Sequence, residues 1–142
     1  YSAVLILFKP YRSDVKYVVA ADLARRTPDQ TIERIIEFAR MYRLTNFAIE
    51  SNQFQKLMVD SLRRRARELG VAMPVTGITS RSNKRQRIAA LEAEVSQGRL
   101  VFARRHLLLM EQLRSFPLGR HDDGPDALEM AVQAVNDPNY HV

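Results

Sequence analysis

Three aspartates near the C-terminus are the first residues whose type and spacing suit chemistry. Asp122, Asp123 and Asp126 lie within five residues, at the entry to a helix expected over 125–135. Because Asp123 and Asp126 are three positions apart, their side chains can face the same way. A hard cation such as Mg²⁺ takes oxygen ligands, typically from one or two protein carboxylates and from the phosphates of a substrate. The spacing therefore indicates a candidate site for a divalent cation.

The same aspartates also fit a structural role. Aspartate is a preferred helix N-cap, and acids in the first turn interact favourably with the helix dipole. Taken alone, the spacing of Asp123 and Asp126 is more typical of a capped helix than of a metal site. Against capping alone, three acids in five residues repel one another more than one cap requires. Both interpretations remain open at this point.

Glu50 is the second acidic candidate, because it ends the apolar segment Phe47–Glu50 just before an expected helix. Where strands and helices alternate, reacting groups lie at the carboxyl ends of strands. On position alone, a solvated Glu50, or one bonded to the next helix, is the commoner arrangement. With the aspartates, Glu50 would complete a set of carboxylates suited to two metal ions that cleave a phosphodiester. Asp22, ending an earlier strand, is interpreted as a surface residue.

Basic residues outnumber acidic ones, with 22 lysines and arginines against 16 aspartates and glutamates and a formal net charge of +6. This balance is typical of proteins that meet phosphate, in nucleic acid or at an anionic membrane. A single basic run usually means a solvated helix face, but several runs without matching acidic runs favour phosphate binding. The runs are Arg81, Lys84, Arg85 and Arg87; Arg63, Arg64, Arg65 and Arg67; and Arg104 and Arg105 with His106.

Composition excludes several classes of site. The chain has no cysteine, so disulfide frameworks, thiolate zinc sites and cysteine nucleophiles are excluded. Its three histidines lack metal-ligand spacing, so we expect no zinc site. The longest apolar run, 3–8, is too short to span a membrane, and no segment resembles a signal peptide. We therefore expect a soluble, reduced, intracellular protein.

The elements that would position these residues alternate along the chain. Apolar segments 2–9 and 15–21, joined by a polar turn, predict a β-hairpin. Thr27, Pro28 and Gln30 have the pattern of a capped helix start, and the apolar spacing continues to about residue 43. The remaining predictions are strands over 46–50, 74–78 and 100–102, and helices over 53–69, 82–96, 107–115 and 125–135. The sequence predicts one α/β domain of 142 residues, a mixed sheet with helices on its faces.

Several motifs follow one another in a recognisable order. They are Tyr1–Val4, Ala48–Asn52, Lys84 with Arg87–Leu91, Gln97–Arg99, Phe116–Pro117 and, most specifically, His121–Leu128. In this order, over nearly the whole chain, the sequence resembles the C-terminal nuclease domain of phage terminase large subunits. The Asp-x-x-Asp-Ala-Leu portion is also similar to the last motif of RuvC-type junction resolvases, which share the RNase H-like fold.

The resemblance implies an RNase H-like, metal-dependent endonuclease that cleaves concatemeric viral DNA during genome packaging in the cytoplasm of a bacterial host. It assigns Glu50, Asp123 and Asp126 to a two-metal Mg²⁺ or Mn²⁺ site, with Asp122 as alternative or support, so these carboxylates should converge. Lys84 and Arg87 would lie near the DNA backbone, within the basic run that holds the other DNA-binding candidates, Arg81 and Arg85. The implied partners are double-stranded DNA, the small terminase subunit, the portal protein and an ATPase domain of the same polypeptide.

The chain also departs from this family. The family's first metal aspartate precedes the stretch matched by Tyr1–Ala3, and the phosphate loop of the ATPase domain is absent. We therefore expect the sheet to lack its first, central strand, and this chain by itself to be a weak or inactive nuclease. Two other interpretations stay open: another RNase H-like nuclease such as a resolvase, and a non-catalytic basic DNA-binding module.

Overall fold

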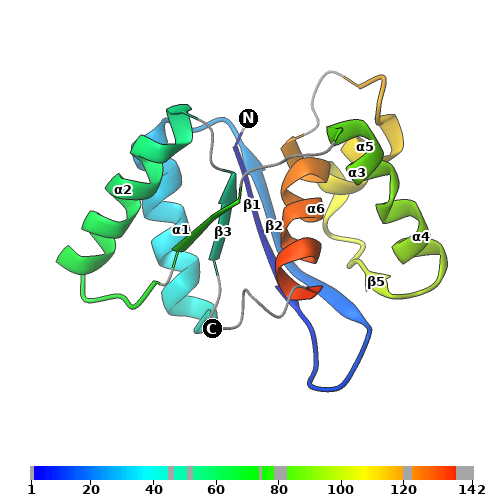
Figure 1. Ribbon diagram of the computed structural model, residues 1–142, viewed down its shortest axis with the longest axis horizontal. Helices are drawn as coiled ribbons and strands as arrows, with labels where there is room; N and C mark the ends of the chain where they lie inside the picture. Colours follow the sequence, from blue (N-terminus) through cyan, green and yellow to red (C-terminus); the bar gives the residue numbers. More distant parts are fainter. Residues whose placement is uncertain are drawn as a thin grey trace. The chain divides into compact units, whose positions relative to one another are not determined.

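The computed structural model describes residues 2–44, 47–50, 53–73, 75–78, 83–119 and 123–136. It is a mixed α/β structure (Figure 1) that divides into two compact units. Unit 1 comprises Tyr1–Arg25 and Arg81–Asn136, and unit 2 comprises Arg26–Ser80 and Asp137–Val142. Each unit is described by itself. Among the described residues, no helix combines the length and the apolar character that a membrane span requires.

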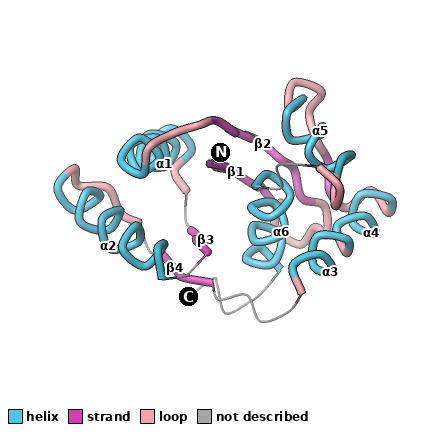
Figure 2. The backbone as a smooth tube through the Cα atoms, turned by 90° about the horizontal axis from the view of Figure 1, so that it is seen from above, coloured by secondary structure: helices cyan, strands magenta, loops and turns pink. Residues whose placement is uncertain are grey.

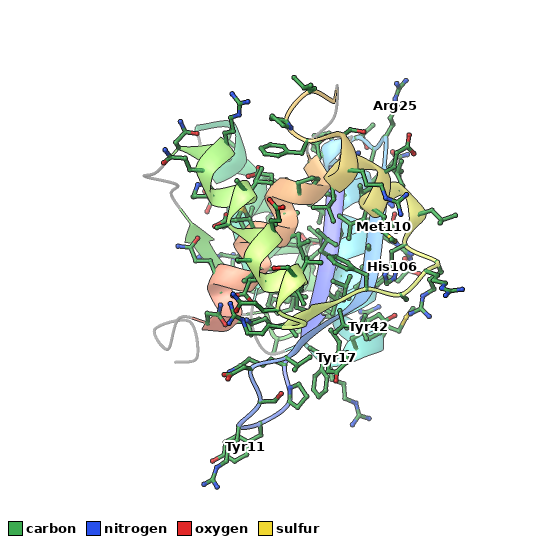
Figure 3. The ribbon with its side chains drawn as sticks, turned by 90° about the vertical axis from the view of Figure 1, so that its right-hand side faces the viewer. Tyr11, Tyr17, Arg25, Tyr42, His106 and Met110 are labelled. Carbon is green, nitrogen blue, oxygen red and sulfur yellow. The ribbon has the colours of Figure 1, made fainter. Side chains whose placement is uncertain are left out.

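Unit 1 contains a three-stranded sheet and four helices among its described residues. The elements are β1 (Ser2–Phe8), β2 (Lys16–Ala24), α3 (Lys84–Ala89), α4 (Leu91–Ser96), β5 (Leu100–Val101), α5 (Leu107–Ser115) and α6 (Asp123–Asn136). The strand order is β1-β2-β5, with β1 antiparallel and β5 parallel to β2. The hairpin that joins β1 to β2 carries the exposed Tyr11 at its tip (Figure 3).

The pairing of β1 with β2 contains a β-bulge. Ile6 pairs with Ala20 and Leu7 pairs with Val18, so Val19 is an extra residue on β2. The carbonyl oxygen of Val19 accepts a hydrogen bond of 3.1 Å from the Arg105 guanidinium. Because of the extra residue, side chains before and after the bulge can face the same core.

The core of unit 1 lies between the sheet and the helices, with α6 alongside β1 (Figure 2). From β2, Val18 is buried in this core, and Ala21 and Leu23, beyond the bulge, pack against it. Its buried members are Val18, Ile88, Leu91, Leu100, Leu109, Leu128 and Val132. Unit 1 thus fixes α6, which carries two of the candidate acids, against the hairpin.

A buried ion pair attaches α4 to the start of β2. Lys16 Nζ lies 2.7 Å from Glu94 Oε2, and the side chains are only 4% and 19% exposed. Arg99 also approaches Glu94, at 3.4 Å, and its carbonyl accepts a hydrogen bond from the Lys16 backbone N–H. Taking a lysine out of water is costly unless it is paired, so Glu94 is required by the position of Lys16.

Unit 2 consists of α1 (Pro28–Tyr42), β3 (Phe47–Glu50), α2 (Gln53–Glu68) and β4 (Val75–Ile78), with β3 and β4 parallel. The predicted capping box at the start of α1 is confirmed: Thr27 Oγ1 accepts from the Gln30 N–H, and Gln30 Oε1 accepts from the Thr27 N–H. A salt bridge of 2.7 Å joins Arg65 on α2 to Glu33 on α1. The buried members of its core cluster are Ile32, Ile36, Ala39, Phe47, Val59 and Leu62.

The predicted α/β class, the hairpin and the mixed sheet are confirmed, whereas three details differ. The helix predicted over 82–96 is two short helices, α3 and α4, interrupted at Ala90. The helix predicted over 125–135 begins earlier, at Asp123. The described strands form two sheets, in which β1 pairs only with β2 and β3 pairs only with β4. The prediction of one domain concerns both units together and stays a prediction.

Replacement of Glu94 by glutamine should destabilise the fold by on the order of 3 kcal/mol at neutral pH, because it leaves Lys16 as a buried charge with a weakened partner. The hydrogen bond from Lys16 lowers the pKa of Glu94, against an opposing effect of burial. A lowered folded-state pKa means that the stabilisation is complete above the usual value of 4.5 and is lost as the pH falls through the lower folded value.

Urea denaturation midpoints measured from about pH 7 down to about pH 3 test this expectation. The Glu94→Gln variant should lose the part of the acid destabilisation that Glu94 supplies. Glu92→Gln, an exposed substitution in the same helix, is the control and should keep the wild-type pH profile. Equal pH profiles for wild type and Glu94→Gln would contradict the assignment.

Candidate active site

The start of α6 brings two candidate acids to the carboxyl end of β2. Asp123 is the first residue of the helix and is half-buried, and Gly124, Pro125 and Asp126 are buried. The approach is close, because a methyl group on Gly124 would lie 2.8 Å from Leu23 Cδ2 near the end of β2. The carboxyl end of a strand is where sequence reasoning placed reacting groups.

Helix α5 closes the other side of this turn. A methyl group on Gly124 would also lie 2.9 Å from Gln112 Oε1 and 3.0 Å from Leu109 Cδ1. Such distances are shorter than ordinary van der Waals contact, so a larger residue at position 124 would force neighbouring side chains to move. The backbone N–H of Gly124 donates a 2.9 Å hydrogen bond to Gln112 Oε1, and this bond is buried. The first turn of α6 is therefore fixed against both β2 and α5.

Asp126 is the most buried of the described candidate acids, with 8% of its surface exposed. Its Oδ1 atom is shielded from solvent and makes no hydrogen bond among the described residues, although Asp126 does take part in another interaction. Asp123 lies three residues earlier, on the same side of the first turn. The pair offers hard oxygen donors of the kind that Mg²⁺ or Mn²⁺ prefers.

The other acidic candidates are placed less completely. Glu50 is the last residue of β3, as predicted, but it belongs to unit 2 and its side chain is outside what the structure describes. Asp122 lies outside the described residues. Within the described part of the chain, no three histidine, aspartate or glutamate side chains form a cluster of metal-binding geometry. The convergence of Glu50 with Asp123 and Asp126 therefore stays a prediction.

The DNA-binding candidates differ in how their side chains are placed. Asn83 caps α3 through its Oδ1, which accepts from the Arg85 N–H at 2.9 Å, and Lys84 is the first residue of the helix. Arg85 is exposed, and its guanidinium has no partner among the described residues. The side chain of Lys84 and the whole of Arg81 are outside the described part. Arg85 is thus the described member of this run that can meet a ligand from solvent.

Arg87 has a structural partner that sequence reasoning missed. Its Nη1 lies 2.5 Å from Glu129 Oε2 on α6, and the two side chains are 14% and 12% exposed. This half-buried salt bridge joins α3 to the helix that carries Asp123 and Asp126. A contact between Arg87 and DNA stays a prediction, and it would have to coexist with the salt bridge.

Some of the other basic residues also serve the fold. Arg65 pairs with Glu33 and with Glu68, and these hydrogen bonds raise the pKa of its guanidinium. Arg105 bonds the carbonyl of Val19 in the β-bulge. His106, which lies just before α5 (Figure 3), is buried, and its burial, together with the neighbouring charge of Arg105, lowers its pKa. These residues therefore cannot all be counted as free phosphate ligands.

No model of a known protein family matches this chain, and no curated protein matches it. A hollow in unit 2, lined by α1 residues such as Glu33 and Arg40 and by Leu69 just beyond α2, contains none of the candidate site residues. The start of α6 is accordingly the strongest candidate site among the described residues.

Sequence patterns did not predict the roles of Gln112 and Glu129 at this site, although the helical spacing of each residue indicated which face it lies on. Gln112 follows the buried Leu109 by three positions, so the helical period already places it on the buried face of α5. Glu129 likewise follows Asp126 by three positions on α6. The period indicates a face, but it does not indicate which distant residue a polar group will meet.

Gly124→Ala should destabilise the protein by about 1–3 kcal/mol, because the added methyl group overlaps Leu23 and Gln112. Alanine is the better helix former, so propensity alone predicts the opposite sign. Thermal or urea denaturation measures the change. In the Leu23→Ala background, where the closest neighbour of the methyl group is removed, the same substitution should cost less.

Gly98→Ala is the matched control for this experiment. A methyl group there meets no atom within 4 Å, but the backbone has a left-handed φ of 72°. Its cost, about 1 kcal/mol, should come from the backbone and should not change with Leu23→Ala. If Gly124→Ala and Leu23→Ala were additive, the close approach at the start of α6 would not be the cause.

Proposed function

We propose that this chain is a metal-dependent DNA endonuclease domain of the type found in phage terminase large subunits. The observation that carries the proposal is the start of α6. There the buried Asp126 and the half-buried Asp123 are presented by one turn that Gly124 holds against β2 and α5. The same turn belongs to His121–Leu128, the most specific part of the sequence resemblance.

The architecture supports an RNase H-like fold as part of this proposal. An antiparallel hairpin, a parallel partner strand and a second parallel strand pair alternate with helices along the chain. Of the candidate acids, Glu50 ends one of the parallel strands and Asp123 begins the last described helix. Their convergence in one metal site is part of the proposal.

The candidate acids suggest a division of roles. Asp123 and Asp126 would hold Mg²⁺ or Mn²⁺, with Glu50 and Asp122 as the further carboxylates of the proposed set. A bound ion of this kind activates water and stabilises the leaving oxygen in phosphodiester cleavage. The protein's own contribution is to hold the carboxylates in place, and the buried first turn of α6 suits that task. The salt bridge from Arg87 to Glu129 gives the same helix a second attachment, to α3.

Double-stranded DNA is the proposed substrate. The net charge of +6 attracts polyanions, and Arg85 offers an exposed guanidinium at the start of α3. The proposed reaction is the one that terminases carry out, the cleavage of concatemeric viral DNA in the host cytoplasm. The proposed partners are a small terminase subunit, a portal protein and an ATPase domain.

Asp126→Asn and Asp123→Asn should each lower cleavage of linear duplex DNA by at least about 100-fold, because loss of a direct ligand should cost no less than loss of a group supporting one. Cleavage by the full-length polypeptide should require Mg²⁺ or Mn²⁺ and stop with a chelator. Initial rates over a metal titration measure both effects. Asp14→Asn, which changes an exposed acid of the hairpin, is the control and should cleave normally.

Two results would contradict this proposal, and they point in different directions. DNA binding without metal dependence and without cleavage would favour a non-catalytic basic module whose aspartates serve as caps. Preferential cleavage of four-way junctions over linear duplexes would favour a resolvase. Comparison of the two substrates at equal metal concentration separates the terminase-like activity from the resolvase.

Replacing Lys84 and Arg85 by alanine should weaken DNA binding to all sequences alike. It should also reduce the slope of log K against log salt by about 0.9 for each phosphate that the protein no longer neutralises. Binding titrations at several salt concentrations measure the slope. Arg87 is kept intact, since its replacement would also leave Glu129 without its salt bridge. Arg114→Ala, which removes an exposed charge from α5, is the control, and an equal slope change there would exclude a specific surface on α3.

A further inference from the structure

We infer that Gln112 is a positioning residue for Asp123 and Asp126, an inference that rests on the proposed function. Gln112 lies on α5 and is 6% exposed. Its Oε1 accepts a buried hydrogen bond of 2.9 Å from the backbone N–H of Gly124, between the two aspartates in sequence. Gln112 would therefore act through the backbone of the turn rather than by touching metal or DNA.

The bond meets a general need of helix starts. The first four N–H groups of a helix have no acceptor within the helix, and a buried one must be satisfied from elsewhere. Here the acceptor for Gly124 comes from another helix, so the bond fixes the start of α6 relative to α5 as well as satisfying the donor. Only the oxygen end of the Gln112 amide can accept, which defines the orientation of the side chain.

The contacts around Gly124 leave the turn little freedom to shift. Leu23 closes one side at 2.8 Å from the position of a methyl group, and Leu109 lies at 3.0 Å. Within this enclosure the bond to Gln112 selects one placement of the turn. Because Asp123 and Asp126 are carried on the same turn, a movement of Gly124 moves both carboxylates together.

The neutrality of the amide also matters. Gln112 accepts a hydrogen bond without adding a negative charge beside two aspartates. A glutamate would keep the acceptor and nearly the same shape, but its charge would attract a cation to the same place. Methionine would keep the length and the burial while removing the acceptor. Gln112→Met therefore separates the hydrogen bond from the shape of the side chain, and Gln112→Glu shows the effect of an added charge when the acceptor is kept.

The test compares Gln112→Met and Gln112→Glu in the full-length polypeptide. Mn²⁺ binding is measured by calorimetry, cleavage of linear duplex by kcat and KM, and stability by the urea midpoint. Gln112→Met should weaken Mn²⁺ binding or kcat by about 10–100-fold, as loss of a group supporting a metal ligand does, with KM for DNA unchanged. Gln112→Glu should bind Mn²⁺ at least as tightly as wild type, because it keeps the acceptor and its added charge attracts the cation.

Val18→Ala controls for lost stability. Val18 is buried in the same core but on β2 before the bulge, so its truncation should lower the urea midpoint and leave Mn²⁺ binding unchanged. If Gln112→Met lowered only the midpoint while Asp126→Asn abolished Mn²⁺ binding, the positioning role would be wrong and the proposed function would stand. If Asp126→Asn bound Mn²⁺ and cleaved DNA like wild type, the proposed function would be wrong and the positioning role would fall with it.

Discussion

The start of α6 packs so closely around position 124 that any side chain there would displace its neighbours, and other features of unit 1 follow from this constraint. Glycine permits the helix to approach Leu23 and Leu109 closely, and this closeness buries the backbone N–H. The buried N–H in turn requires an acceptor, which Gln112 supplies from α5. Asp126, two residues later, is buried as a consequence of the same approach. Gly124, the residue with the least restricted backbone, thus lies where the start of α6 is held most closely by its neighbours.

The basic residues of this chain form ion pairs within the fold, and by the proposed function some of them also bind DNA. Arg87, Arg65 and Lys16 are each paired with a glutamate from a different element, at distances of 2.5–2.7 Å. A phosphate that took Arg87 from Glu129 would leave a half-buried carboxylate close to DNA. Pairing inside the fold therefore reduces the number of cations available to a polyanion, and exposed residues such as Arg85 gain importance for binding.

Local signals in the sequence predicted local structure well. Thr27 and Gln30 form the capping box that their spacing indicated, and the apolar segments around a polar turn form the predicted hairpin. Contacts between distant residues were not predictable in the same way. Lys16 meets Glu94 across 78 positions and Arg87 meets Glu129 across 42, and a hydrophobic period does not specify such partners. The same limit applies to the candidate site. The turn with Asp123 and Asp126 lies where the sequence indicated a helix start. Its hydrogen bond from Gly124 to Gln112 depends on how α5 packs, which the local sequence does not specify.

The β-bulge at Val19 determines which side chains of β2 face the core of unit 1. Val18 and Leu23 contact the same core although they are an odd number of positions apart, which strict alternation does not allow. In a regular strand of the same length, Leu23 would turn away from Gly124 and Asp22 would face the apolar core. Deleting Val19 would instead restore regular alternation with Val18 and Leu23 still on one face, but it would remove the carbonyl that Arg105 bonds. In related sequences, we therefore expect the extra residue and the arginine to be kept or lost together.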